Sequence, residues 1–268
     1  MSAGNEESLI EALEELDLAI ISKQELEFYQ NLNPASLIFD ISSQRERELI
    51  SPYLAYSKAQ LAQDLFALAA SKSYSPKYFV EFGATDGLSL SNTWLLEKKL
   101  EWSGILVEPA KIWHTQLRAN RNCIIDTRCV ANKSREKVRF LEVNQIDKGS
   151  PELSGMKEFS NNGDWASDIR QKESMEYLVE TVSLEDLLNE HNAPEEIQFI
   201  SIDTEGSELE IIKDFDFNSR RINTICIEHN FVEKNRKAIN TLLTNYGYQQ
   251  VAKEISQWDD WYILGGNT

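Results

Sequence analysis

The sequence KYFVEFGATDG, at residues 77–87, decides how this chain folds. Its first half, residues 77–82, is a short and largely apolar run of the kind that forms a buried strand. Gly83 and Gly87 follow, and glycine lets a backbone turn sharply and approach a ligand closely. We therefore predict a strand that ends in a glycine turn, leads into a helix and holds a ligand at the turn.

Short apolar runs alternate with helix-like stretches on both sides of this segment. Their periodicity predicts strands at residues 103–107, 123–130, 137–143, 179–182, 197–202 and 224–228, and a closing antiparallel hairpin at 248–253 and 261–264. Helices are expected at residues 58–71, 94–100, 112–120, 184–189, 209–213 and 235–245. Such alternation predicts an α/β fold, with a mostly parallel sheet and helices on both faces.

The chain divides into an extension and one main domain. Residues 1–54 are predicted to form a helical N-terminal extension, because apolar residues recur at helical spacing between positions 9 and 20. Residues 55–268 are predicted to form a Rossmann-like domain. Within that domain, residues 144–177 are polar and contain several glycines and asparagines, so we expect them to form a lid over the substrate.

Composition and charge exclude several classes of function. The 268-residue chain has a formal net charge of −17 and no basic patch, so we expect no nucleic-acid partner. It has neither an apolar run long enough to span a membrane nor a secretory signal, so no membrane association is expected. Cys123, Cys129 and Cys226 form no CxxC pair, which is typical of a reducing compartment. These features predict a cytoplasmic protein and say nothing about oligomeric state.

An acidic residue follows the second predicted strand at a spacing typical of nucleotide-type sites. Glu108 ends the run 103–107 and lies 21 positions after Gly87. A carboxylate at this place can accept hydrogen bonds from both hydroxyls of a ribose, about 20 residues beyond the glycine turn. This pairing predicts a ligand that contains adenosine.

The residues of the glycine turn favour S-adenosylmethionine over a dinucleotide. A dinucleotide fingerprint that begins at Gly83 needs glycines at its third and sixth positions, where this chain has Thr85 and Leu88. Glu81 and Asp86 also place carboxylates beside the turn, which would repel a pyrophosphate. The same carboxylates suit a ligand that carries an ammonium and a sulfonium group.

Several stretches taken together resemble the FkbM-type methyltransferases, over roughly residues 55–265. The matching stretches are SKAQLAQD at 57–64, VEFGATDG at 80–87, SNT at 91–93, WSGILVEP at 102–109 and SIDTEGSE at 201–208. The resemblance implies a class I methyltransferase fold, which is Rossmann-like with a mostly parallel seven-stranded sheet, and S-adenosylmethionine as the cofactor. It also implies methylation of an oxygen atom, usually on a sugar or a natural-product scaffold.

The resemblance further implies a role for individual residues. Glu108 would hold the ribose of the cofactor, and Val130 and Ala131 would line the adenine. Asp203 would lie close to the methionine moiety and the transferred methyl group. The residues implied around the amino-acid end of the cofactor are Glu81, Gly83, Asp86, Gly87, Ser91, Asn92 and Thr93.

Methyl transfer from a sulfonium is an in-line displacement, so the enzyme mainly aligns the acceptor and removes its proton. We expect His229 to be the general base, because a neutral imidazole is available near pH 7. A hydrogen-bonded structural histidine at a strand end is the equally open alternative. Asp203 and Glu205 are further candidate catalytic residues. The candidates for contact with the acceptor are Glu208, Glu228 and Trp165.

The carboxylates that follow residues 197–202 and 224–228 could also bind Mg²⁺ or Ca²⁺, because these ions prefer oxygen ligands. We do not favour a metal at this point, since the same carboxylates are suited to contact the acceptor directly. We therefore predict no metal ligand in this chain.

Three functions from different classes remain open. The first is an S-adenosylmethionine-dependent O-methyltransferase that acts on a hydroxyl or carboxylate of a sugar, natural product or peptide in a biosynthetic pathway. The second is an NAD-type oxidoreductase, which the glycine spacing disfavours. The third is a non-catalytic module that binds a protein through its acidic N-terminal arm, since residues 1–50 contain eleven acidic and three basic residues.

Overall fold

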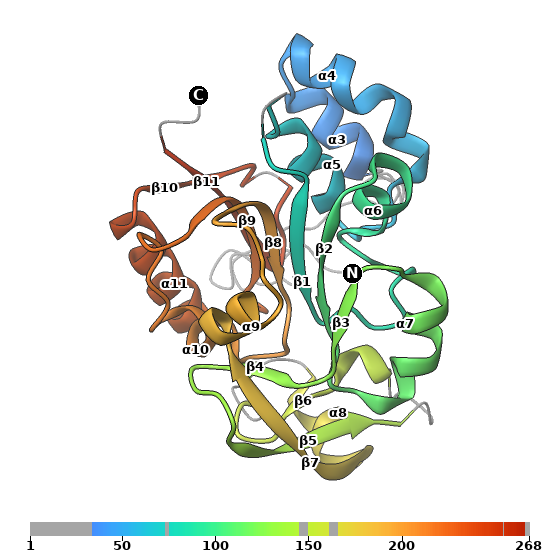
Figure 1. Cartoon of the computed structure of the whole chain (residues 1–268), viewed down its shortest axis with the longest axis vertical. Helices are drawn as coiled ribbons and strands as arrows, with labels where there is room; N and C mark the ends of the chain where they lie inside the picture. The colour runs from blue at the N-terminus through green and yellow to red at the C-terminus, as the bar shows by residue number, and fades with distance from the viewer. Residues whose placement is uncertain (1–33, 73–74, 145–149, 161–165, 254, 266–268) are drawn as a thin grey trace, which may run out of the picture.

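A seven-stranded sheet forms the centre of the structure, a computed structural model that describes residues 34–72, 75–144, 150–160, 166–253 and 255–265. The strand order is β10-β11-β9-β8-β1-β2-β3 (Figure 1). Neighbours from β9 to β3 pair in parallel, and β11 pairs antiparallel with both β9 and β10. This confirms the predicted α/β fold with a large, mostly parallel sheet. The strands are β1 (Tyr78–Phe82), β2 (Ser103–Val107), β3 (Ile124–Asp126), β8 (Glu196–Ile202), β9 (Arg221–Glu228), β10 (Tyr248–Val251) and β11 (Asp259–Leu264).

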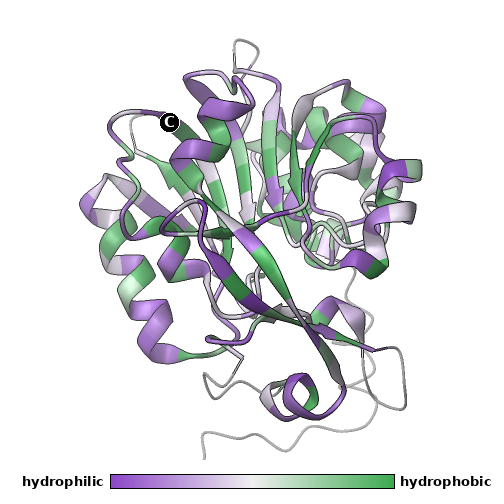
Figure 2. Cartoon of the chain, turned by 60° about the horizontal axis from the view of Figure 1, so that its bottom comes forward, coloured by the Kyte–Doolittle hydropathy of each residue, from purple (hydrophilic) through white to green (hydrophobic). Residues whose placement is uncertain are grey.

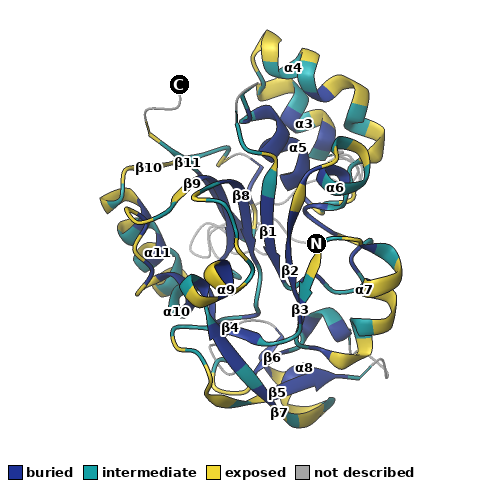
Figure 3. Ribbon diagram, viewed as in Figure 1, coloured by how far each residue is buried: buried dark blue, intermediate teal, exposed yellow. Residues whose placement is uncertain are grey.

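Both faces of this sheet are buried beneath helices. Successive residues of a strand point to opposite sides, so one strand contributes to two hydrophobic clusters. Phe79 of β1 belongs to one hydrophobic cluster and Val80 to another. Figure 3 shows the strands dark blue between helices whose outer surfaces are yellow, and Figure 2 shows the matching change from green to purple. The Val80 cluster includes residues of α9 (Leu184–Glu190), α10 (Glu208–Ile212) and α11 (Glu233–Asn245). The Phe79 cluster includes residues of α5 (Gln63–Ala69), α6 (Trp94–Leu100) and α7 (His114–Asn120). Directly before α7 comes the 3-10 turn η2 (Lys111–Trp113).

The order of the strands reverses at β1, which lies between β2 and β8. Ligands of open α/β sheets bind outside the carboxyl ends of the strands at such a reversal. The side chains that follow β1, β2 and β8 are therefore placed together by the topology, although they lie far apart in the sequence.

Part of the predicted extension packs against the sheet domain. The helices α3 (Pro34–Ile41) and α4 (Gln44–Ile50) and the 3-10 turn η1 (Ser51–Tyr56) lie beside α5. Ala35, Ile38 and Ile50 are buried in the same cluster as Phe79. The predicted helix at residues 9–20 lies outside the described residues.

The helix predicted at residues 58–71 begins later than expected, at Gln63. Ala62 has a left-handed backbone, with φ at 64°, and this conformation ends any helix that approaches from its N-terminal side. The preceding amides find side-chain partners instead: Lys58 N donates to Asp64 at 3.1 Å and Leu61 N donates to Gln63 at 2.9 Å. The first five residues of the predicted helix are thus a loop.

The strand predicted at residues 123–130 is two strands in two different sheets. Ile124–Asp126 pairs with β2, whereas β4 (Cys129–Ala131) pairs with β7. Between them the Asp126 carboxylate accepts hydrogen bonds from the backbone and side chain of Arg128, both at 3.0 Å, and this local bonding accompanies the change of sheet.

The second sheet has four strands in the order β4-β7-β5-β6 and was not predicted. It consists of β4, β5 (Lys137–Val143), β6 (Gly155–Met156) and β7 (Ser174–Ser183), and Figure 1 shows it below the central sheet. The predicted run 137–143 is β5, and the predicted strand 179–182 begins earlier, at Ser174. The described parts of residues 144–177 belong to this layer, with the 3-10 turn η3 (Pro151–Leu153), β6, α8 (Ser167–Lys172) and the start of β7.

Among the described residues, no helix is both long and apolar enough to cross a lipid bilayer. Cys123, Cys129 and Cys226 are free thiols.

Candidate functional site

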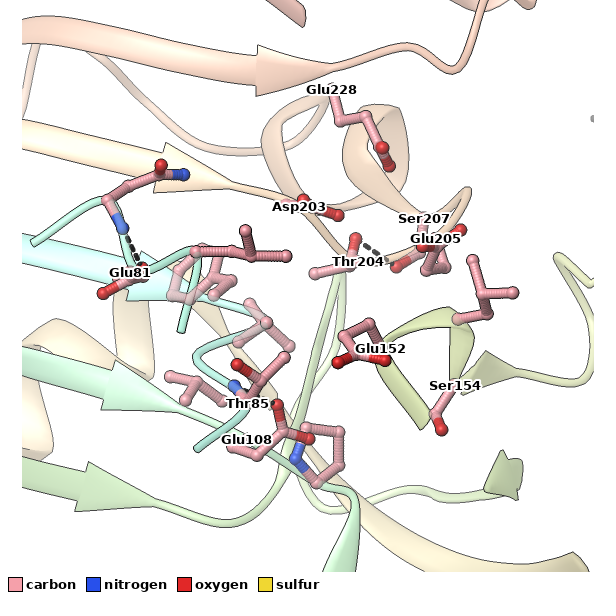
Figure 4. Close-up of a pocket in the computed structure, with 18 of the residues that line it drawn as sticks. Glu81, Thr85, Glu108, Glu152, Ser154, Asp203, Thr204, Glu205, Ser207 and Glu228 are labelled. Carbon is pink, nitrogen blue, oxygen red and sulfur yellow. Dashed lines mark hydrogen bonds between the residues drawn. The ribbon is translucent and has the colours of Figure 1, made fainter. Parts of the chain in front are cut away.

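A cavity of about 340 Å³ lies at the carboxyl ends of β1, β2, β8 and β9. Its volume is in the range of pockets that bind small molecules. The 3-10 turn η3 and strand β6 close one side of the cavity, because Pro151, Leu153 and Met156 also line it. Of the predicted site residues, those that line it are Glu81, Gly83, Ser91, Asn92, Glu108, Val130, Asp203, Glu205 and Glu228 (Figure 4).

The two glycines of the turn are required by close packing. A Cβ atom on Gly83 would lie 2.1 Å from the carbonyl oxygen of Asp203, so only glycine allows the ends of β1 and β8 to meet. A Cβ atom on Gly87 would lie 2.6 Å from the side chains of Leu117 and Arg121. Both glycines have φ at 74°, the left-handed region. Both glycines approach the chain itself closely, and Gly83 also lines the cavity.

Glu81 anchors the segment 91–93 beneath the cavity. Its carboxylate accepts hydrogen bonds from Asn92 N at 2.7 Å, from Ser91 Oγ at 3.1 Å and from Thr93 Oγ1. The buried guanidinium of Arg121 lies 3.6 Å away. Glu81, expected at the amino-acid end of the cofactor, lines the cavity, bonds to the segment 91–93 and is paired with Arg121. No sequence signal pointed to Arg121.

Two other residues expected around the cofactor serve the local turn. The Asp86 carboxylate accepts hydrogen bonds from Leu88 N at 2.8 Å and Ser89 N at 2.7 Å, and Asp86 does not line the cavity. Thr93 is fully buried below Glu81. The expectation that Asp86 and Thr93 touch the cofactor is therefore corrected: their polar atoms face the protein. Gly87 and Ala131 also lie outside the cavity lining.

Glu108 lines the cavity at the end of β2, as its spacing suggested. Its two carboxylate oxygens accept hydrogen bonds from Thr85 N at 2.8 Å and Ala110 N at 2.7 Å. Burial raises the pKa of Glu108 to about 7, and the nearby carboxylates of Glu142 and Glu81 act in the same direction. A carboxylate has roughly four acceptor sites, so two remain for hydroxyl groups of a ligand.

Three carboxylates converge on the opposite wall. Asp203 follows β8, Glu205 lies in the loop after it, and Glu228 ends β9, with one oxygen of each within 4.8 Å of the others. Burial, reinforced by mutual repulsion, holds the pKa of Asp203 and Glu228 well above the ordinary value. Arg170 Nη1 donates to Glu205 at 2.7 Å. This acidic cluster (Asp203, Glu205 and Glu228) is suited to bind a positive charge or a proton.

Glu208 has a structural role and not the expected contact with the acceptor. Its buried carboxylate accepts hydrogen bonds from Thr204 N at 3.0 Å and Gly206 N at 2.9 Å. These bonds hold the loop that presents Glu205, whose φ of 60° is left-handed. Glu208 does not line the cavity.

His229 does not lie in the cavity lining, and this corrects its assignment as general base. It is only 3% exposed, and both ring nitrogens have partners. Nδ1 accepts a hydrogen bond from Phe231 N at 3.0 Å, so Nε2 carries the proton and donates to the carbonyl oxygen of Asp259 at 3.1 Å. The structure matches the alternative of a hydrogen-bonded histidine at a strand end.

The rim of the cavity carries apolar side chains that the sequence did not single out as site residues. Phe231 is 66% exposed and Leu90 is 47% exposed, and both line the cavity together with Gln60 and Trp258. Exposed large apolar groups beside a pocket are typical of a surface that binds a ligand. Trp165, expected at the acceptor site, lies outside the described residues.

Comparison with known proteins gives one match. A family model described as "Methyltransferase FkbM domain" matches residues 81–250, which is well over half of the 268 residues and includes the whole acidic cluster. No curated protein matches the chain, and no solved structure matches it.

Proposed function

The chain belongs to the FkbM methyltransferase family, and from that premise we propose that it transfers a methyl group from S-adenosylmethionine to a hydroxyl oxygen. The acceptor would be a sugar, a natural product or a peptide. The observation that carries the proposal is the cavity at the strand-order reversal, with Glu108 on one wall and the acidic cluster on the other.

The residues of the cavity fit this cofactor. Asn92 Oδ1 is buried in the lining without a hydrogen-bond partner, and it could accept an N–H from the ammonium group. Glu108 has acceptor sites free for the ribose hydroxyls, and Val130 offers an apolar surface for the adenine. The carboxylates opposite suit a ligand that carries positive charge. A pyrophosphate in the same place would meet negative charge, which disfavours the NAD-type alternative.

S-adenosylmethionine, when bound, would supply an electrophilic methyl group on a sulfonium, which is a good leaving group because it keeps the electron pair of the carbon–sulfur bond. The protein aligns the acceptor and takes its proton. Asp203 or Glu228 can accept that proton, because a carboxylate whose pKa is raised is a stronger base than an exposed one. Leu153 and Met156 keep one side of the cavity apolar and so limit the access of water.

The acidic cluster also bears on the class of acceptor. Without a bound cation, a carboxylate acceptor would meet the carboxylates of Asp203, Glu205 and Glu228 at short range, which costs binding free energy. A neutral hydroxyl avoids this repulsion. The apolar rim of Leu90, Phe231 and Trp258 fits an acceptor with an apolar face, such as a sugar ring or an aromatic scaffold.

A thermal-shift comparison tests the proposal. S-adenosylhomocysteine should raise the melting temperature of the protein, and NAD should leave it unchanged. The variant Glu108→Ala loses charge-assisted hydrogen bonds worth about 1.5–3 kcal/mol, so it should bind S-adenosylhomocysteine roughly 10- to 100-fold more weakly. Equal affinity in the wild type and Glu108→Ala would remove the ribose assignment, and stabilisation by NAD alone would overturn the function.

A further inference from the structure

The acidic cluster gathers three carboxylates on one wall of the cavity. Figure 4 shows Glu228 reaching from one side of the cavity toward Asp203 and Glu205. Arg170 donates to Glu205 at 2.7 Å. One oxygen of each carboxylate lies within 4.8 Å of the others, so their charges repel unless a proton or a cation lies between them.

A second observation points to a missing ligand. Glu228 is only 6% exposed and lines the cavity, yet its Oε2 has no hydrogen-bond donor in the part of the chain that the structure describes. Glu81, Glu108 and Glu208 are equally buried, and each is bonded by two or more protein groups. A buried carboxylate oxygen without a partner is costly, so Glu228 needs a group from outside the chain.

We propose that Asp203, Glu205 and Glu228 bind a divalent metal cation of the Mg²⁺, Mn²⁺ or Ca²⁺ type. The donor atoms are all carboxylate oxygens, which these hard ions prefer, and neither a thiolate nor an imidazole belongs to the cluster. The separation of up to 4.8 Å suits oxygens on opposite sides of one ion, since the metal–oxygen distance is about 2.1 Å for Mg²⁺ and 2.4 Å for Ca²⁺. A doubly charged ion would offset the mutual repulsion of three carboxylates at this separation.

The cation has a use in methyl transfer, and in this respect the inference rests on the proposed function. The cavity is open beside the cluster, so an acceptor hydroxyl can occupy a coordination position on the ion. A divalent cation lowers the pKa of a bound hydroxyl. The proton then passes to a water molecule or a neighbouring carboxylate at lower cost, the oxygen bonds to the methyl carbon, and the carbon–sulfur bond breaks. Asn230 lines the same cavity and provides an amide beside Glu205.

The experiment uses Mn²⁺ as the probe, titrated into the full chain after chelator treatment and followed by electron spin resonance of the free ion. The wild type should bind about one Mn²⁺ per chain, and Glu228→Gln should bind it at least about tenfold more weakly. The control is Glu210→Gln, a carboxylate on α10 that bonds to Lys213 outside the cavity, and it should bind like the wild type.

Two further readouts make each outcome decisive. Glu228→Gln should melt no lower than the wild type in chelator, so that weak binding cannot be attributed to unfolding. S-adenosylhomocysteine is titrated in parallel: a wild type that binds it but not Mn²⁺ overturns the metal and keeps the proposed function. Mn²⁺ binding without S-adenosylhomocysteine binding would do the reverse. Several weak sites that persist unchanged in Glu228→Gln would show only a surface effect of the acidic chain and would overturn the metal site.

Discussion

Two groups of buried carboxylates lie at the same edge of the sheet and differ in how their charge is balanced. Glu81, at the end of β1, accepts three hydrogen bonds from residues 91–93 and has the guanidinium of Arg121 beside it. Glu228, at the end of β9, faces Asp203 and Glu205 and has one oxygen without a donor.

This difference distinguishes carboxylates that stabilise the fold from carboxylates that are available to a ligand. A balanced carboxylate such as Glu81 holds the chain in place, and a ligand would add little to it. An unbalanced group lowers the stability of the ligand-free protein, and proteins keep such groups where a ligand or a reaction uses them. We therefore assign the Glu81 group to the scaffold and the acidic cluster to the chemistry.

The largest expected effect breaks the balanced side. Arg121→Met leaves the buried Glu81 and the half-buried Glu97 without their guanidinium partner. Loss of one partner of a buried ion pair costs about 3–5 kcal/mol, so urea unfolding should show a loss of that order. Arg118→Met, an exposed residue of α7, which ends just before Arg121, is the control and should change stability by less than about 0.5 kcal/mol. A loss below about 1 kcal/mol in Arg121→Met would show that Arg121 balances nothing.

Glu108 lies between these two cases, because two backbone amides donate to it and no cation among the described residues pairs with it. Its effect on stability can be separated from the others by changing the pH. Its folded pKa of about 7 lies above the ordinary value of 4.5, so between these values the folded protein holds a proton that the unfolded chain has lost. The contribution of Glu108 to stability is therefore full below about pH 4.5 and is lost as the pH rises to about 7, by an amount on the order of 3 kcal/mol.

The measurement is the free energy of unfolding of the ligand-free protein at several pH values from 5 to 8, for the wild type and Glu108→Gln. Other buried carboxylates also titrate, so the difference between the two slopes is the quantity that matters. The variant should lose less stability than the wild type over this range. Parallel slopes would mean that Glu108 titrates in its ordinary range.

The smallest effect concerns His229, which lies next to Glu228 but outside the cavity. His229→Gln disturbs two hydrogen bonds, so it should cost about 1–2 kcal/mol of stability. Its affinity for S-adenosylhomocysteine, measured by titration calorimetry, should stay within about threefold of the wild type. That is well below the tenfold change that about 1.4 kcal/mol of binding free energy would produce. A loss of affinity larger than that of Glu108→Ala would move His229 back into the site.

Local patterns were sufficient to predict much of this site. Gly83 and Glu108 were predicted from their place after apolar strands, and the topology brings the ends of those strands together. The sheet strands could be recognised because both of their faces are buried, which makes them continuous apolar runs.

The remaining features depend on contacts between distant residues. The second sheet requires Ser174–Ser183 to pair with Lys137–Val143, and no local signal reports such a pairing. Arg121 reaches Glu81 across 40 positions, and the hydrogen bonds of His229 become visible only when β9 and β11 are side by side. Carboxylates were easy to find in the sequence, whereas their balance of charge could not be read from it.

The most direct test compares Glu81→Gln with Glu228→Gln by urea unfolding in cation-free buffer. Each variant replaces one buried carboxyl group with an amide and changes almost no volume. We predict that Glu81→Gln is less stable than the wild type by about 1–3 kcal/mol, because it weakens charge-assisted hydrogen bonds. Glu228→Gln should be at least as stable as the wild type, because it relieves repulsion within the acidic cluster. Equal losses in the two variants would contradict the account, since they would show that Glu228 is as well balanced as Glu81.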